Sequence, residues 1–319
     1  MQLHAFSLRP RSAFGTPLAG DTLFGQLCWA VRERFGDARL CELLAGYTEG
    51  HPFMVASDGF PAGFLPRPGL PDALFNDGIA PDQRKAARRL QWLPFDALAQ
   101  PAHVWPSLAV DLASRKSPHS QLAHGSTTVL TQNTINRLTG TTGTGPFAPR
   151  QVERFALGTD EGLEVYVVID EHRFAVSDVR TLLTDIGLFG FGRDASTGLG
   201  KFEVGPSRLI VWPVTESRHA ITLAPCAPNP VQLDSAQCFY LPQTRFGRHG
   251  NVLVRSGNPF KRPVQYMKTA AFLSFTEPSR ALWHGTGLSG ARQPISLTLP
   301  ETVHQGYAPV VPVASGEHA

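Results

Sequence analysis

The chain has 319 residues, of which 42% are hydrophobic and 17% charged, and a formal net charge of +3. This is the composition of an ordinary globular protein, long enough to bury a substantial core and to form two domains, and a net charge this small does not by itself indicate a nucleic-acid partner. No stretch approaches the roughly 18 apolar residues of a membrane span, and the first residues lack the pattern of a secretory signal, so we expect a cytoplasmic protein.

The cysteines and the basic residues give further information about possible binding sites. The four cysteines, Cys28, Cys41, Cys226 and Cys238, show no C-x-x-C spacing, so we predict buried thiols and neither a zinc site nor a disulfide framework. We predict no metal and no cofactor. Five of the 29 basic residues are lysine, which leaves 24 arginines. Arginine suits phosphate contacts and stacking on bases, although a biased genome composition produces the same excess.

The first 50 residues predict a strand and two helices. Residues 2–10, QLHAFSLRP, are typical of a largely buried strand. Asp21 stands where the cap of a first helix is expected, and Asp37 where the cap of a short second helix ending at Leu44 is expected. The apolar face of the first helix ends at Gly36 and consists of Leu23, Phe24, Leu27, Cys28, Val31 and Phe35.

The next hundred residues are rich in proline and glycine and show no sustained periodicity. We predict a long insertion at about 56–150, because loops of that length usually carry a function. The segment TQNTINRLTGTTGTGPF, residues 131–147, predicts a protruding hairpin with a glycine-rich tip, and a plain surface loop explains the same residues. A second segment, DQRKAARRL, predicts a helix with a basic face formed by Arg84, Lys85, Arg88 and Arg89.

Regular patterns return after the insertion. Residues 163–170 predict a buried strand, Ser177 is expected to cap a helix that stops at Gly187, and two short strands are expected at 201–204 and 208–212. The resulting order, strand, helix, strand, insertion, strand, helix, strand, is that of a ferredoxin-like β-α-β-β-α-β sandwich of the α+β class. We therefore predict a ferredoxin-like domain at 1–213 and a smaller β-rich domain at 214–319.

A glycine-rich loop, GFGRDASTGLGKF, follows the second helix of this pattern. It is not a dinucleotide fingerprint, because its glycines leave a helix instead of opening one, and it is not a Walker loop, because Phe202 follows Lys201. An anion-binding nest and a simple tight turn both remain open. The residues that would contact an anion here are Gly190, Gly192, Arg193, Ser196, Thr197, Gly198, Gly200 and Lys201.

Five motifs occur in the order in which they are found in proteins of the RAMP superfamily. They are FGTPLAGDTLFGQLCWA (14–30), TQNTINRLTGTTGTGPF (131–147), FGFGRDASTGLGKFE (189–203), GNPFKRPV (257–264) and QGYAPVVPV (305–313). The chain most resembles the Cas5 group, and within it the fourth subunit of the Csm effector complex of type III-A CRISPR systems. One departure is Asp194, since related proteins often carry further basic residues there and a carboxylate repels phosphate.

The resemblance implies an RRM-like RAMP fold with two ferredoxin-like modules and no catalytic activity. It implies a subunit in antiviral defence that holds the 5′ handle of the guide RNA (crRNA). Its partners would be the large polymerase-like subunit, the backbone RAMP subunit and target RNA, in a type III-A or III-B assembly. The glycine loop would face RNA, as would Asn133, Arg137 and Thr139 in the inserted hairpin, and Lys261 and Arg262 would contact RNA or a protein subunit.

The sequence also allows two enzymatic alternatives to an RNA-binding subunit. HGST at His124 and HGTG at His284 match the paired H-x-S/T signatures of 2H-type RNA phosphoesterases, in which one histidine acts as base and the other as acid. A RAMP-type CRISPR endoribonuclease would need a histidine to take the proton from a 2′-hydroxyl, for which His4 and His51 are candidates. We favour an RNA-binding subunit that is not an enzyme.

Overall fold

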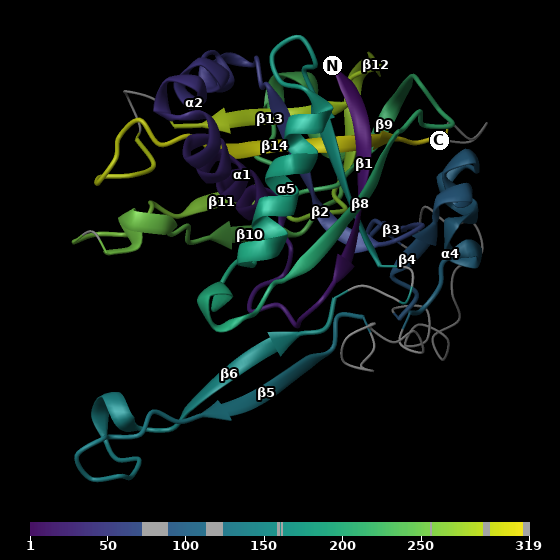
Figure 1. Cartoon of the computed structure of the whole chain (residues 1–319). Coiled ribbons are helices and arrows are strands. Elements are labelled where there is room, and N and C mark those ends of the chain that lie inside the picture. The colour runs from purple at the N-terminus through teal and green to yellow at the C-terminus, as the bar shows by residue number, and fades with distance from the viewer. Residues whose placement is uncertain are drawn as a thin grey trace.

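The computed structural model describes residues 1–71, 89–112, 124–157, 160, 162–255, 257–289 and 294–314. The chain forms two four-stranded sheets, two smaller antiparallel strand pairs beside them, a few helices and a long projecting hairpin (Figure 1). Neighbouring strands run antiparallel in both large sheets. No helix within these ranges is both long and apolar enough to cross a membrane.

The first sheet has the strand order β2-β7-β1-β8. A helix connects β1 to β2, and another connects β7 to β8, so the predicted order of elements is present. The bounds are β1 Gln2–Pro10, α1 Gly20–Phe35, α2 Asp37–Leu44, β2 Met54–Pro61, β7 Leu163–Ile169, α5 Val176–Phe189 and β8 Phe202–Leu209.

Strand β7 is buried along its whole length because both faces of the sheet are covered. Helices α1 and α5 cover one face, with Leu27 of α1 and Leu182 of α5 fully buried. The other face is covered by residues from the insertion and from the chain after β8, where the ring of Trp212 lies 5.8 Å from that of Tyr166 and 5.5 Å from that of Phe95. A continuous apolar run is what a strand in this position requires.

The predicted helix caps are wrong in one respect. Helix α1 begins at Gly20, and the side chain that binds its first amide is that of Asp58, whose Oδ1 accepts from Gly20 N at 2.7 Å. Asp21, Asp37 and Ser177 lie inside the first turns of their helices and do not occupy the N-cap positions, although Asp21 Oδ1 accepts from Thr22 N at 2.8 Å. The capping group of α1 comes from a residue 38 positions away, which local spacing cannot reveal.

The end of α5 also differs from its prediction. The helix runs two residues beyond Gly187, and Gly190, with φ of 104°, takes the C-cap position. Gly187 is needed for packing, since a Cβ there would lie 2.2 Å from the carbonyl oxygen of Phe202 on β8. The two strands expected at 201–204 and 208–212 are one strand, β8, whose pairing with β1 shifts between Phe6 and Leu8.

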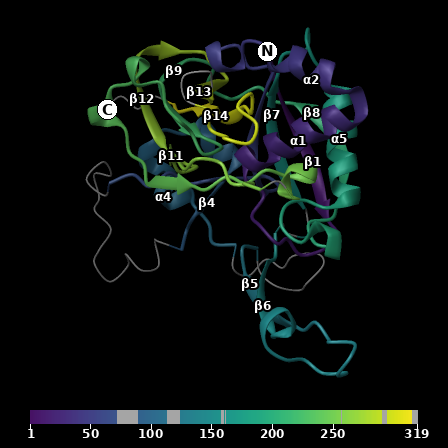
Figure 2. The ribbon, with the colours of Figure 1, turned by 90° about the vertical axis from the view of Figure 1, so that its left-hand side faces the viewer.

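The insertion begins after Pro61 and not at residue 56, because 54–61 pair with β7 as strand β2. Its basic run lies outside the described residues except for Arg89, which is exposed in a turn. Strands β5 and β6 form a hairpin, here called the arm (residues 127–155), that stands clear of the body in Figures 1 and 2. The insertion contains β3 Phe64–Pro66, β4 Trp92–Pro94, α4 Trp105–Leu108, β5 Thr127–Gln132 and β6 Arg150–Phe155.

The second sheet is built entirely from residues after 213, in the order β12-β9-β14-β13, and a two-stranded hairpin, β10-β11, lies beside it. The bounds are β9 Ser217–Thr222, β10 Pro242–Arg245, β11 Val264–Met267, β12 Phe272–Ser279, β13 Trp283–Leu288 and β14 His304–Pro312. This part of the chain is β-rich, as its sequence indicated.

The two sheets share one core. Strand β14 is buried throughout and packs on α1 and β2. Gln305 of β14 binds both the N–H and the C=O of Ala56 at 2.8 Å, and the Tyr307 hydroxyl donates to the carbonyl of Tyr47 at 2.6 Å. The division of the chain at residue 213 into two domains stays a prediction.

Candidate nucleic-acid interface

The glycine loop, residues 190–201, joins α5 to β8 and folds tightly on itself. Gly190 and Gly200 are buried, with φ of 104° and 70°. A Cβ on Gly200 would lie 2.2 Å from the carbonyl oxygen of Phe191, and one on Gly190 would lie 2.4 Å from that of Leu199. Backbone packing therefore requires these two glycines, whatever the loop binds.

Three loop amides predicted to meet phosphate are engaged within the protein. Gly190 N donates to Ile186 O at 2.7 Å, Gly198 N to Ala195 O at 3.0 Å, and Gly200 N to Ala13 O at 2.8 Å. A phosphate would have to displace these bonds to reach the three amides. The exposed polar side chains of the loop are Arg193, Ser196, Thr197 and Lys201.

The glycine loop lies against the base of the arm. Arg193 Nη2 donates to the carbonyl of Glu153 on β6 at 2.7 Å. The chain after β1 contacts both the base of the arm and the glycine loop. Phe14 exchanges backbone hydrogen bonds with Phe155 of the arm, and Gly15 packs so closely on the loop that a Cβ there would lie 2.2 Å from the carbonyl oxygen of Arg193. Two of the regions predicted to contact RNA are thus brought together.

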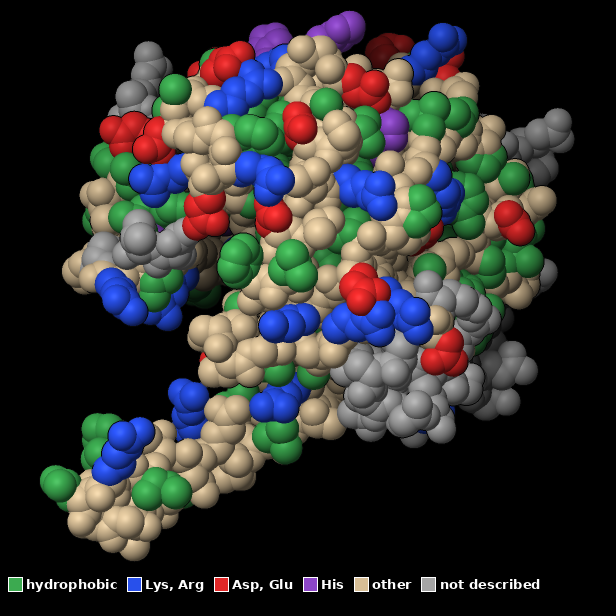
Figure 3. Space-filling model, in the orientation of Figure 1, with side chains coloured by type: hydrophobic (Ala, Val, Ile, Leu, Met, Phe, Trp, Pro, Cys, Tyr) green, Lys and Arg blue, Asp and Glu red, His purple; other side chains and the backbone are tan. Residues whose placement is uncertain are grey.

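Cations gather where the arm leaves the body. Arg11, from the end of β1, forms an exposed pair with Glu203 at 2.6 Å. Figure 3 shows Lys and Arg side chains along this junction and on the arm, with a hollow between arm and body. Such a surface attracts a polyanion. The further basic residues here are Arg154, Arg193 and Lys201, and Arg150 lies farther out on the arm, opposite Gln132.

Asp194 is held within the loop. Its backbone is left-handed, with φ of 61°, and its Oδ2 lies 3.4 Å from Nε of Arg193. The side chain is only 24% exposed. The carboxylate therefore offsets part of the Arg193 charge, and Lys201 is the other exposed cation of the loop.

The tip of the arm is held by its own hydrogen bonds. The Asn136 side chain accepts from Leu138 N at 2.9 Å, and Thr139 bonds to Thr141 through their hydroxyls at 3.1 Å. Leu138 is 97% exposed. Asn133, Arg137 and Thr139, the predicted RNA contacts, are all exposed there. The tip thus presents polar, cationic and apolar groups to solvent.

Lys261 and Arg262 are neighbours that face opposite ways. Lys261 N donates to Gly247 O at 2.8 Å, and its side chain runs inward, where burial lowers the pKa of the ammonium group against the attraction of Asp21. Arg262 is exposed, and its backbone N–H donates to Ile295 O at 2.7 Å. Of the two predicted contacts, Arg262 is the one available to a ligand on the outer surface.

Asp21 is the centre of a buried polar cluster that sequence analysis did not find. Arg245 binds its carboxylate through Nε at 3.0 Å and Nη2 at 2.9 Å, and Nη2 also reaches the hydroxyl of Thr22 at 3.0 Å. His304 Nε2 lies 3.6 Å away. Burial opposes ionisation of Asp21, but His304 and the Arg245 charge outweigh it and lower the pKa to about 2. The cluster joins α1 to β10 and β14.

Asp58 lies next to this cluster and behaves in the opposite way. Its carboxylate accepts from Gly20 N at 2.7 Å and from the Thr269 hydroxyl at 2.6 Å. Burial raises its pKa from 3.8 to about 7, and these two bonds offset only part of that rise. Asp58 thus holds a proton at a pH where an unfolded chain would have released it.

We expect Asp58→Asn to raise the free energy of unfolding by about 2 kcal/mol at about pH 8, after allowance for partial exposure, and to have little effect at about pH 4. A carboxyl with a raised pKa makes stability fall as pH rises from about 4 to about 7, because only the unfolded state loses its proton there. Urea unfolding at both pH values measures the change. Asp37→Asn, at an exposed site, is the control, and an unaltered pH profile in the Asp58 variant would contradict the expectation.

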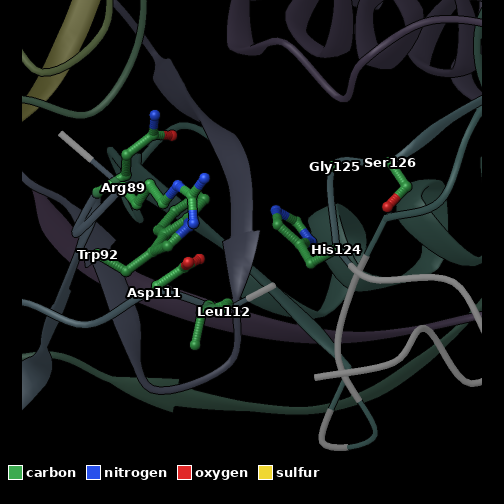
Figure 4. Close-up of a pocket in the computed structure, with 8 residues that line it drawn as sticks. Arg89, Trp92, Asp111, Leu112, His124, Gly125 and Ser126 are labelled. Carbon is green, nitrogen blue, oxygen red and sulfur yellow. The ribbon is translucent and has the colours of Figure 1, made fainter. Parts of the chain in front are cut away.

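The two histidines of the phosphoesterase alternative have separate surroundings. His124 lines a cavity of about 390 Å³ with Arg89, Trp92 and Asp111, and its ring lies 5.2 Å from that of Trp92 (Figure 4). His284 is buried on β13, where its Nε2 accepts from Asn229 N at 3.3 Å and burial lowers its pKa to about 4. Their described contacts have no residue in common.

The two histidines of the endoribonuclease alternative, His4 and His51, also have different surroundings. His4 is buried, and its Nε2 lies 2.6 Å from Oε1 of Glu171. His51 is exposed. Among the described residues, no group of three or more His, Cys, Asp or Glu side chains is arranged to hold a metal ion. The four cysteines are free thiols; Cys226 is buried as predicted, Cys28 and Cys238 are half-buried, and Cys41 is exposed, so the prediction of burial is wrong for Cys41 and only partly met for Cys28 and Cys238.

The fold has close counterparts among solved structures. The chain aligns with one described as a Csm1-Csm4 cassette in complex with pppApA, at 15% identity and a TM-score of 0.56, and with the same cassette in complex with AMPPNP, at 15% and 0.55. It aligns equally with a Csm3-Csm4 subcomplex of the type III-A CRISPR-Cas interference complex, at 13% and 0.56. Each alignment covers 99% of this chain and 100% of the other.

Sequence comparison adds nothing to this, since neither a protein-family model nor a curated protein matches the chain. Csm4 is the subunit named in both kinds of solved complex. The agreement along the whole chain confirms, at the level of the fold, the resemblance that the five motifs indicated.

Proposed function

We propose that the chain is a non-catalytic RNA-binding subunit of a type III-A CRISPR effector complex, the counterpart of Csm4. In that complex it holds the 5′ handle of the guide RNA and contacts the large polymerase-like subunit and the backbone subunit, which correspond to Csm1 and Csm3. The observation that carries the proposal is the whole-length agreement in fold with two different subcomplexes whose common member is Csm4.

The fold gives the proposal a second support. We infer that the first sheet with α1 and α5 is a ferredoxin-like module, since its strand order places β7 and β1 in the centre and both helices on one face. The chain after 213 would then be a second β-rich module of the RAMP fold.

The junction of arm and glycine loop supports the choice of ligand. Single-stranded RNA is bound by cationic tracks together with hydroxyl and apolar groups that contact riboses and bases. The junction offers Arg11, Arg193 and Lys201 beside the hydroxyls of Ser196 and Thr197. The arm adds an exposed apolar tip at Leu138. We place the guide handle along this junction.

The proposal is tested by isolating the tagged protein from its native host and sequencing the RNA that accompanies it, with the 5′ ends mapped. We expect RNAs that share one 5′ segment and differ downstream, together with other subunits of the complex. A protein that comes down without RNA and without partners would contradict the proposal.

The same experiment with Arg193→Ala and Lys201→Ala combined locates the RNA. We expect less bound RNA, and in binding assays a salt dependence shallower by about 1.4 logarithmic units, since each phosphate contact to a single strand contributes about 0.7. Arg218→Ala with Arg280→Ala, which removes two exposed cations from the second sheet, is the charge-matched control. Equal loss in both double variants would remove the assignment of the loop.

A further inference from the structure

The β10-β11 hairpin has two chemically different faces. Several side chains of the hairpin and of the chain next to its two strands make hydrogen bonds to the body. Arg245 binds buried Asp21, His249 Nε2 lies 2.6 Å from the hydroxyl of Ser296, and the Tyr266 hydroxyl donates to Gln305 O at 3.1 Å. The hairpin is therefore fixed to the rest of the protein through its inner face.

Just beyond the paired residues of β10 and β11, the chain carries exposed side chains that point away from these contacts. Phe246 is 76% and Phe260 61% exposed. Arg248 pairs with Phe260 across the hairpin, and its guanidinium carbon lies 5.6 Å from the centre of the Phe260 ring. Arg262 is the fourth exposed residue. We call Phe246, Arg248, Phe260 and Arg262 the hairpin face.

The stretch of sequence that contains the hairpin face carries charge of one sign. Between Asp234 and Glu277 the sequence has no acidic residue, and it has six cations, Arg245, Arg248, Arg255, Lys261, Arg262 and Lys268. Only Arg245 among them is neutralised by a close carboxylate in the part of the chain that the structure describes. A surface of this kind complements a polyanion.

The exposed aromatic rings of the hairpin face favour one class of polyanion over others. Phe246 and Phe260 expose apolar rings beside arginine side chains, a combination that suits a surface covered by a ligand. Unpaired bases stack on aromatic side chains and on arginine, whereas the bases of a duplex are already stacked on each other. Rings interleaved with arginines therefore fit single-stranded RNA better than a duplex or an apolar protein surface.

We propose that the hairpin face binds single-stranded RNA by stacking unpaired bases on Phe246 and Phe260, with Arg248 and Arg262 on the flanking phosphates. The inference rests on the proposed function and adds to it a second RNA contact, separate in sequence from the glycine loop and the arm. In Figure 1 the end of this hairpin and the arm both point to the left, so the two contacts open toward the same side.

The test compares variants of the full chain that keep the apolar volume but differ in the ring. Phe246→Leu with Phe260→Leu removes stacking, and Phe246→Tyr with Phe260→Tyr retains it. Binding is measured with a labelled single-stranded RNA of about 12 nucleotides that contains 2-aminopurine, whose fluorescence falls on stacking. We expect the leucine variant to raise Kd at least about tenfold and to lose the fluorescence change, and the tyrosine variant to bind like the wild type.

The loop variant, Arg193→Ala with Lys201→Ala, is measured alongside. Normal binding and quenching by the leucine variant, with weak binding by the loop variant, would overturn the hairpin face and leave the proposed function standing. A wild-type chain that binds no single-stranded RNA would overturn both. A leucine variant that keeps RNA binding but no longer retains another subunit on gentle isolation would make the hairpin face a protein-docking surface, which also contradicts the inference.

Discussion

Replacing Arg245 with methionine should lower the free energy of unfolding by about 3 kcal/mol, because it leaves the carboxylate of Asp21 buried without its cation. The Asp21 side chain is 2% exposed and that of Arg245 31% exposed. Little water can therefore solvate the Asp21 carboxylate after the guanidinium group is removed. The change is measured as a lower midpoint of urea unfolding at an unchanged slope.

Arg280→Met provides the matched control. Arg280 also binds one carboxylate, that of Glu216, through Nε and Nη2 at 3.0 and 2.7 Å, but the two side chains are 77% and 45% exposed. We expect a loss below about 1 kcal/mol, as for other surface ion pairs. Equal losses at the two sites would contradict the importance of burial.

The pH dependence of the Arg245 effect follows from Asp21. Its folded pKa of about 2 is below that of an unfolded aspartate, so the pair contributes fully above about pH 4 and less as the pH falls toward 2. The difference between wild type and Arg245→Met should shrink over that window. A difference that stays constant would assign the loss to packing and not to the charge.

Gly200→Ala should destabilise the protein by at least about 3 kcal/mol, the second large effect that we expect. The new Cβ would lie 2.2 Å from the carbonyl oxygen and 2.5 Å from the nitrogen of Phe191, and neither backbone atom can move without displacing buried Phe191. The φ of 70° adds the cost of a left-handed alanine.

Gly198→Ala separates the two causes, because Gly198 has φ of 94° but nothing within 4 Å of its Cβ position. We expect about 1 kcal/mol from the backbone alone. Thermal or urea unfolding of both variants gives the comparison. If Gly200→Ala were no worse than Gly198→Ala, the tight fold of the loop would be wrong.

Both Arg245→Met and Gly200→Ala would disturb elements that position the groups proposed to bind RNA. The Asp21 cluster ties α1 to the hairpin that carries Phe246, Phe260 and Arg262, and the buried glycines hold the loop that carries Arg193 and Lys201. The groups proposed to touch RNA are exposed and contribute little to stability. Loss of an anchor should therefore weaken RNA binding indirectly, whereas loss of an exposed contact should leave the midpoint of unfolding unchanged.

The order of elements could be predicted from the sequence because the signals are local. Burial on one or both faces imposes periods of two or 3.6 residues, and these periods identified β1, α1, β7 and α5 to within a few residues. The glycine loop and the arm were located for the same reason, since glycine-rich turns interrupt the periods. The ordered motifs then indicated the family of folds.

Partners and directions of side chains were decided by the tertiary structure alone. The local sequence predicts Asp21 as a helix cap. In the structure its partner is Arg245, 224 residues later in the sequence, and the side chain that caps α1 is that of Asp58. Lys261 and Arg262 look equivalent as a basic pair, yet the fold leaves Arg262 exposed and Lys261 partly buried. Electrostatic and packing energies depend on distance in space, which the chain fixes only when it folds, so such pairs leave no periodic trace in the sequence.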